Sequence, residues 1–229
     1  MALIAVNLQA VRSRIARAAQ AVQRHPGDIA LVAVSKTFPA GHIAEAFAAG
    51  QKAFGENHVQ EAVEKITVLA ALPLEWHFIG PIQSNKTGLI ARHFGWAHSV
   101  DRENIAQRLN AARPDGTPPL NVCIQVNVSG EAAKSGVAPG EEAKLADAIA
   151  RLPRLKLRGL MAIPEPATDV TLQRRRFALL RELKDRLAAR GHALDTLSMG
   201  MSDDFEAAIM EGATMVRIGT AIFGQRQKT

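Results

Sequence analysis

Short apolar runs alternate with stretches of helical periodicity along this chain. The run from Ile29 to Ser35 is apolar on both faces, which is typical of a strand buried in a parallel sheet. Before it, Val11, Ile15 and Val22 recur at helical spacing and predict an opening helix over residues 8–23. The same change of period repeats along the chain, and this repetition is the pattern of parallel strands joined by crossover helices.

Eight runs of the strand kind occur, and helices are predicted between most of them. The strands are predicted at residues 29–35, near 54–57, and at 75–79, 96–100, 120–128, 155–163, 194–198 and 214–218. Because eight parallel strands with right-handed crossovers close into a barrel, we predict a single α/β domain over residues 1–229. Its fold is a (β/α)8 TIM barrel with an extra N-terminal helix. An open doubly wound sheet is the alternative, but its first turn is glycine-rich, whereas residues 35–39 read SKTFP.

The predicted fifth strand has the clearest pattern, because every second position is apolar. The other positions are Asn121, Cys123, Gln125 and Asn127, and these are expected to face the barrel interior or the functional site. Cys123 lies within this strand, and a cysteine placed there is expected to be part of the core.

The charge of the chain changes this picture little. The net charge is +6 and the pI about 9.9, and a basic balance attracts phosphates on nucleic acids or small molecules. One tight basic run occurs, at residues 174–176, and no aromatic residues interleave with it for base stacking. We interpret the arginines as solvated helix faces and expect no nucleic acid partner. A nucleic-acid-binding module would instead bind polyanions with an affinity that falls steeply with salt.

Other features exclude further classes of protein. The apolar runs are far too short to cross a bilayer, and no signal peptide is recognisable, so no membrane association is expected. The single cysteine rules out an internal disulfide and fits a reducing compartment, which predicts a cytoplasmic protein. The seven histidines have no metal-ligand spacing, so no metal site is expected.

The candidate chemistry begins with Lys36, which directly follows the buried first strand. In a TIM barrel, function lies at the carboxyl ends of the strands. A lysine desolvated there becomes a neutral, nucleophilic amine, whereas one that extends into solvent stays an ordinary ammonium. The position of Lys36 alone favours neither the neutral amine nor the solvated ammonium. His77 is expected to be a packed, hydrogen-bonded residue, although a role as ligand or acid is the alternative, and Met161 is expected to pack at the rim.

The loops after the seventh and eighth strands carry glycines and hydroxyls, at residues 198–204 and 217–221. Barrels often bind phosphate there, and the start of a helix favours an anion. Simple capping of a helix at Asp204 by Ser202 and Asp203, with Glu206 reaching back, would explain part of the same pattern.

Closure of the barrel makes the first and eighth strands neighbours, so Lys36 and Arg217 are expected to lie side by side. Two adjacent buried cations require an anion, which a phosphorylated aldehyde would supply. The alternative for Arg217 is a surface ion pair with Glu211.

At this point the residues resemble a known family. The matching segments are AVSK at 33–36, FGEN at 54–57, WHFIG at 76–80, QSNK at 83–86, KSG at 134–136, GLM at 159–161, LSMGMSD at 197–203 and VRIGT at 216–220. They resemble the pyridoxal phosphate homeostasis protein family, once called the proline synthase co-transcribed homologues, over nearly the whole chain. That family is similar to the N-terminal barrel domain of alanine racemase.

The resemblance implies a role for each matching residue. Lys36 matches the lysine that forms a Schiff base with pyridoxal 5′-phosphate, a form of vitamin B6. Arg217 matches the arginine that faces the pyridine nitrogen, and Asn57 matches a residue of the ring pocket. The residues that match the phosphate-binding loops are Ser198, Met199, Ser202, Gly219 and Thr220. Because an arginine does not readily accept a proton, the ring nitrogen opposite it should stay unprotonated and act as a poorer electron sink.

Two functions of this family are open to the chain. One is intracellular homeostasis of the cofactor by binding and buffering, with transient delivery to apo-enzymes and no catalysis of its own. The other is an amino-acid racemase or related fold-type III enzyme. Alanine racemase uses a tyrosine from a second domain, and this sequence contains no tyrosine, which favours the first function and a monomer. Lys86 and Lys134 are expected to be loop lysines, with transient capture or guidance of the aldehyde as the alternative.

Overall fold

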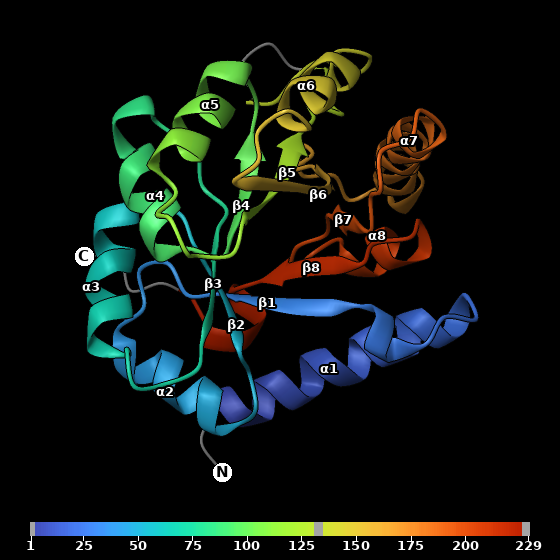
Figure 1. Cartoon of the computed structure of the whole chain (residues 1–229). Helices are drawn as coiled ribbons and strands as arrows, with labels where there is room; N and C mark the ends of the chain where they lie inside the picture. The colour runs from blue at the N-terminus through green and yellow to red at the C-terminus, as the bar shows by residue number, and fades with distance from the viewer. Residues whose placement is uncertain (1–2, 131–134, 226–229) are drawn as a thin grey trace.

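The computed structural model describes residues 3–130 and 135–225. Eight parallel strands form a closed barrel in the order β1 to β8, with β1 paired to β8, which confirms the predicted (β/α)8 fold (Figure 1). The strands are β1 (Ala30–Val34), β2 (Ala53–Glu56), β3 (Glu75–Phe78), β4 (Trp96–Val100), β5 (Leu120–Gln125), β6 (Leu155–Met161), β7 (Thr196–Ser198) and β8 (Met215–Ile218).

The helices cover the outside of the barrel (Figure 1). They are α1 (Leu3–Ala21), α2 (Ala40–Ala48), α3 (Val59–Val68), α4 (Thr87–His93), α5 (Glu103–Ala112), α6 (Glu142–Ile149), α7 (Val170–Ala189), α8 (Phe205–Met210) and α9 (Thr220–Phe223), with 3-10 turns at Pro26–Asp28 and Ser84–Lys86. The short α4 was not anticipated, because its seven residues offer only two turns of periodicity.

The extra N-terminal helix, α1, begins five residues earlier than the apolar pattern predicts. Ile4 lies one turn before Leu8 and is buried with it, so the apolar stripe extends toward the start of the chain. The helix packs against α8, α9 and α2, beside the junction of β1 and β8 (Figure 1).

The fifth strand is shorter than predicted and ends at Gln125 rather than near residue 128. Beyond it, Asn127 N donates to the carbonyl of Val137 at 2.9 Å, and Val137 N donates to the carbonyl of Gln125 at 2.9 Å. The chain therefore leaves the barrel ladder to pair with a neighbouring loop. The sixth strand likewise ends at Met161, two residues before its predicted end.

Two apolar clusters fill the molecule. The larger one lies between the strands and the helices. The smaller one lies inside the barrel and consists of Val32, Trp96, Cys123, Met161 and Met215. Cys123 is therefore core, as expected, and Met161 packs inside the barrel rather than at its rim. No helix in residues 3–130 and 135–225 combines the length and apolar character that a membrane span requires.

Candidate functional site

A pocket of about 220 Å³ opens at the carboxyl ends of β1, β2 and β8. Its lining residues are Val34, Lys36, Phe38, Asn57, Ile79, Ile163, Met201, Ser202, Asp203, Arg217, Gly219 and Thr220. Six of the eight residues predicted to bind the cofactor line it; the two that do not are Ser198 and Met199. Lys36 and Arg217 meet here because Val32 of β1 is in register with Arg217 of β8, as barrel closure predicted.

Ser198 and Met199 lie below the pocket. The Met199 side chain is wholly buried in the larger apolar core, and its backbone N donates to the carbonyl of Met215 at 3.1 Å. Ser198 is also wholly buried, and its hydroxyl contacts the guanidinium of Arg217 instead of the pocket. Ser198 can therefore act on a ligand only through the position of Arg217.

Arg217 is a buried cation, with 3% of its surface exposed. Its Nη1 donates to Ser198 Oγ at 2.6 Å, and its Nη2 donates to the carbonyl of Ala162 at 2.9 Å. Burial lowers the pKa of Arg217 to about 10, so it remains charged at neutral pH. Among the described residues, no ion pair includes it. Asp204 acts on it only from a distance, as a charge that raises its pKa. A buried cation without a carboxylate in direct contact favours an anionic ligand in the pocket that it lines.

The alternative partner of Arg217, Glu211, is engaged elsewhere. Its carboxylate accepts from Arg174 Nε at 2.8 Å and from Arg181 Nη1, and both arginines belong to α7. The surface ion pair between Arg217 and Glu211 that the sequence left open is therefore wrong.

A chain of hydrogen bonds runs from Arg217 down through the barrel interior. His98 Nδ1 lies 2.8 Å from Ser198 Oγ, and His98 Nε2 lies 3.0 Å from His77 Nδ1. The hydrogen bonds end at His77, whose buried Nε2 has no hydrogen-bond partner among the described residues. Glu75 Oε1 lies 3.6 Å beyond it and accepts from Trp96 Nε1 at 2.7 Å. His77 also stacks on Trp96 with 5.4 Å between ring centroids, so it is the packed, hydrogen-bonded residue that the sequence predicts.

An arginine can only donate, so Ser198 Oγ accepts from Arg217. The hydroxyl has a second lone pair as well as its hydrogen, so the tautomer of His98 decides which way the bond between Ser198 Oγ and His98 Nδ1 runs. The bond between His98 Nε2 and His77 Nδ1 follows the same tautomer. Both imidazoles are neutral, because burial lowers the pKa of His77 and lowers that of His98 well below 6.5.

A second buried network lies behind the loop that carries Lys36. Ser35 Oγ donates to Glu56 Oε1 at 2.7 Å, and Lys65 Nζ donates to the same oxygen at 2.8 Å. Lys65 also bonds Glu61, which accepts the backbone N–H of Thr37. Burial, the largest influence, raises the pKa of Glu56 despite its bond to Lys65. Partial burial also acts to raise the pKa of Glu61, but the hydrogen bonds from Lys65 and Thr37 together outweigh it and lower that pKa.

His98 and the three charged residues of this second network were not predicted from the sequence. His98 carried a usable signal, since it lies two positions after Trp96, on the same face of a short strand that is mainly apolar. Glu61 and Lys65 are spaced four apart on a helix, which is also the pattern of an ordinary surface ion pair. The neighbouring sequence does not distinguish a buried pair from a surface pair.

The remaining candidates lie elsewhere. Lys86 ends a 3-10 turn and lines a separate hollow of about 270 Å³ that shares only Asn57 with the main pocket. Lys134 lies outside the described residues. Within the described part of the chain, no group of three metal-ligating side chains comes together.

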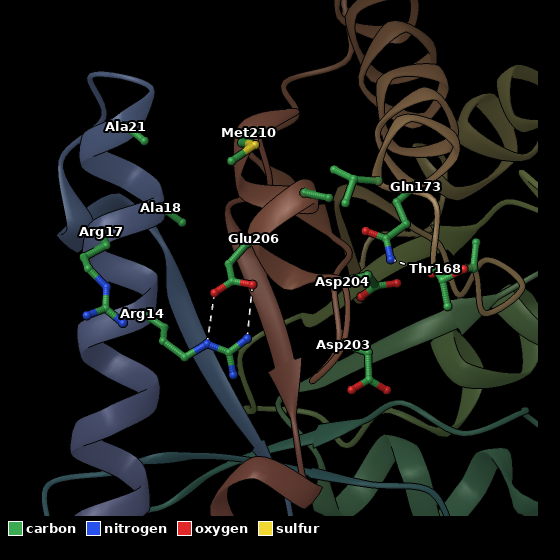
Figure 2. Close-up of a pocket in the computed structure, with 13 residues that line it drawn as sticks. Arg14, Arg17, Ala18, Ala21, Thr168, Gln173, Asp203, Asp204, Glu206 and Met210 are labelled. Atoms are coloured by element: carbon green, nitrogen blue, oxygen red, sulfur yellow. Dashed lines mark hydrogen bonds and ion pairs between the residues drawn. The ribbon is translucent and has the colours of Figure 1, made fainter.

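A larger hollow, of about 610 Å³, lies outside the barrel between α1, α8 and the start of α7. Figure 2 shows Glu206 of α8 reaching Arg14 of α1 across it, with Nε to Oε1 at 2.9 Å. Glu206 therefore does not reach back to cap its own helix. The residue at that cap position is Asp204, whose carboxylate accepts the N–H of Met201 at 2.6 Å, so the sequence alternative of capping by Ser202 is wrong.

The barrel and its site define a class of protein. The chain belongs to the family described as alanine racemase, N-terminal domain, whose model matches residues 6–227. Within that class it is 62% identical to the pyridoxal phosphate homeostasis protein of Pseudomonas aeruginosa, over 99% of this chain and 97% of that protein. It is 56% identical to the protein of the same name from Escherichia coli, over 97% of each. The family predicted from the sequence motifs is thus confirmed.

Solved structures agree with this placement. PipY of Synechococcus elongatus, with pyridoxal 5′-phosphate bound, matches with a TM-score of 0.83 and 38% identity, over 96% of this chain and all of that one. An alanine racemase from Clostridium difficile has a TM-score of 0.75 at 17% identity, over 97% of this chain and 56% of its own. At that identity the racemase shares the fold, and no more follows from the likeness.

Proposed function

We propose that this chain binds pyridoxal 5′-phosphate and serves the intracellular homeostasis of this cofactor. The observation that carries the proposal is the pairing of Lys36 with the buried cation Arg217 in one pocket. An amine and a buried positive charge together suit a ligand that is both an aldehyde and an anion. The relatives named above, one of them 62% identical, support the same function.

Each residue of the pocket has a role in this proposal. Lys36 holds the cofactor as a Schiff base, and Asn57 lines the ring. Arg217 faces the pyridine nitrogen, and Ser198 holds Arg217 in place through its 2.6 Å hydrogen bond. The phosphate is bound by the hydroxyls and backbone of the two following loops, at Ser202, Gly219 and Thr220, while Met199 anchors the first loop by its burial.

The bound cofactor would supply an electrophilic carbonyl and an electron-withdrawing ring. Arg217 limits the second property, because a guanidinium does not give up a proton to the ring nitrogen. Racemisation also needs an acid on the ring face opposite the lysine. Cys123 is not suited to this, because it is buried inside the barrel and burial raises its pKa to about 12. Binding without dedicated catalysis is therefore favoured over the racemase alternative.

We further propose that the protein acts in the cytoplasm as a single-domain monomer, storing the cofactor and passing it transiently to apo-enzymes. The pocket is open at the barrel mouth, so a bound cofactor could leave without rearrangement of the barrel.

The visible spectrum tests the proposal. Added pyridoxal 5′-phosphate should give wild-type protein a yellow absorption band, and borohydride reduction should then fix the cofactor mass on Lys36. Lys36→Ala should lose the band completely, whereas Lys86→Ala, a matched change outside the pocket, should keep it. An identical spectrum for wild type and Lys36→Ala would refute the assignment.

The racemase alternative has its own measurement. An enzyme of that kind would exchange the α-hydrogen of an amino acid with solvent deuterium at a catalytic rate. We expect no such exchange across a broad amino-acid panel when cofactor is bound.

A further inference from the structure

The backbone beside Lys36 adopts an unusual conformation. Among the described residues other than glycine, only Gln23 and Thr37 have a positive φ, of 56° and 69°. Gln23 directly follows the turn that ends α1, where a left-handed residue is common. Thr37 ends no helix, and a β-branched residue in this region is a genuine outlier. Such residues persist where surrounding contacts hold them, and they cluster at functional sites.

The contact that holds Thr37 comes from helix α3. Its backbone N donates to Glu61 Oε1 at 2.7 Å, across 24 positions of sequence. Glu61 is in turn held by Lys65, one turn further along the same helix. Its own loop also holds it, because Phe38 N donates to the carbonyl of Ser35 at 3.1 Å and closes a turn with Thr37 as its third residue. Glu61 adds to this turn a charged acceptor from another element.

The residue on the other side of Lys36 is fixed by the same group. Lys65 Nζ donates to the carbonyl of Ser35 at 2.9 Å, and Glu56 Oε1 accepts from the hydroxyl of Ser35 at 2.7 Å. Ser35 and Glu56 are wholly buried, and Lys65 is 7% exposed. Both neighbours of Lys36 are thus tied to one cluster of two carboxylates and one ammonium.

This cluster is costly, and it is separate from the pocket. Neither Glu56, Glu61 nor Lys65 lines the cavity that contains Lys36. Buried ion pairs contribute little net stability, because desolvation offsets their attraction, and their best-attested benefit is to specify one conformation. The conformation specified here is that of the backbone from which Lys36 enters the pocket.

We propose that Glu61 is a positioning residue for Lys36, acting with Lys65 and Glu56 on the backbone at either side of it. This inference rests on the proposed function, in which Lys36 captures the aldehyde of pyridoxal 5′-phosphate. Capture joins the amine nitrogen to the aldehyde carbon and releases water, so it depends on the approach of a single atom. Small displacements of a reacting group reduce such steps strongly, and the cluster prevents them.

The test compares four variants of the full chain. Glu61→Ala removes the acceptor for the Thr37 amide, whereas Glu61→Gln keeps an oxygen there and loses the charge. Glu64→Ala is the matched control, because Glu64 is an exposed glutamate on the same helix. The double variant Glu61→Ala/Thr37→Gly lets residue 37 reach a positive φ without the acceptor.

The readouts are the affinity for pyridoxal 5′-phosphate and the rate of appearance of the Schiff-base band, well below the melting temperature of each variant. We expect Glu61→Ala to weaken binding about tenfold or more, the equivalent of one lost hydrogen bond to a charged group. Glu61→Gln should retain most of the affinity, Glu64→Ala should match wild type, and the double variant should recover part of the loss. A residue with only a structural role would change the melting temperature and leave both readouts unchanged.

Equal affinity of Glu61→Ala and Glu64→Ala would overturn the inference, and so would failure of Thr37→Gly to restore any binding. If Glu61→Ala does not fold, Glu61→Asp replaces it, since its shorter side chain withdraws the acceptor from Thr37; unchanged binding then refutes the inference. These results are distinct from failure of the proposed function, in which wild-type protein itself would form no band.

Discussion

Behind Lys36 the pocket is supported by charged side chains, whereas beneath Arg217 it is supported by neutral imidazoles. The first network acts on the backbone at either side of Lys36, through Ser35 and Thr37. The second acts on the side chain itself, through Ser198. In the proposed function, the residue that forms a bond is thus supported at its neighbouring main chain, and the residue that presents charge is supported at its side chain.

The charged network and the imidazole chain should also respond differently to pH. The charged network contains a carboxylate whose pKa is raised by burial and another whose pKa is lowered by hydrogen bonds, so acid affects their stabilising contributions in opposite ways. The imidazole chain contains two histidines whose pKa values are both lowered, mainly by burial. Acid therefore only weakens the imidazole chain that supports Arg217.

Removal of the buried cation should have the largest effect. In Arg217→Gln the side chain can still bond Ser198 but carries no charge. We expect the affinity for pyridoxal 5′-phosphate to fall about 10- to 100-fold, the range for a lost hydrogen bond to a charged group. Absorbance titration measures it. Arg174→Gln, which alters an arginine of α7 that is paired with Glu211, is the control and should bind normally. Equal affinities in both variants would show that Arg217 does not face the ligand.

Acid should weaken the fold through the imidazole chain. Because the folded-state pKa of His98 lies below 6.5, its stabilising contribution is present above pH 6.5 and is lost as the pH falls toward the folded-state value. Each such group contributes up to about 1.4 kcal/mol per pH unit in that window. Urea unfolding at pH 7, 6 and 5 should therefore show falling stability in wild type and a shallower slope in His98→Phe. An identical dependence of stability on pH in wild type and His98→Phe would show that His98 does not make the imidazole chain sensitive to acid.

Glu75, beyond the end of the imidazole chain, should have the smallest effect on stability and on cofactor affinity. Glu75 is 54% exposed at its side chain, so solvent screens its effect on His77. Glu75→Gln should change stability by less than about 1 kcal/mol and leave cofactor affinity within about threefold of wild type. Thermal unfolding and the same titration measure both. A loss of affinity as large as that of Arg217→Gln would mean that the imidazole chain transmits the charge of Glu75 to Arg217.

The architecture was predictable because it depends on periodicity and on a general rule. Eight apolar runs imply a barrel, and closure of that barrel is by itself enough to place Lys36 next to Arg217. Strand ends were less certain, since β5 ends where Asn127 pairs with Val137 and no residue type announces that exchange.

The supports of the site could not be predicted, because their partners are distant in sequence. His98 and Ser198 are 100 positions apart, and the Thr37 amide and Glu61 are 24 apart. Motif matching identified Ser198 as a site residue, but only the structure shows that its hydroxyl is turned toward Arg217 and not toward the pocket.

The seam between β1 and β8 has a consequence for how the protein is made. Lys36 follows the first strand of the barrel and Arg217 belongs to the last, so the two halves of the pocket emerge from the ribosome at opposite ends of synthesis. Contacts of such long sequence separation form late in folding. If Lys36 captures the cofactor as proposed, a nascent chain exposes this lysine long before it has the guanidinium of Arg217, and only the finished barrel can retain the vitamin.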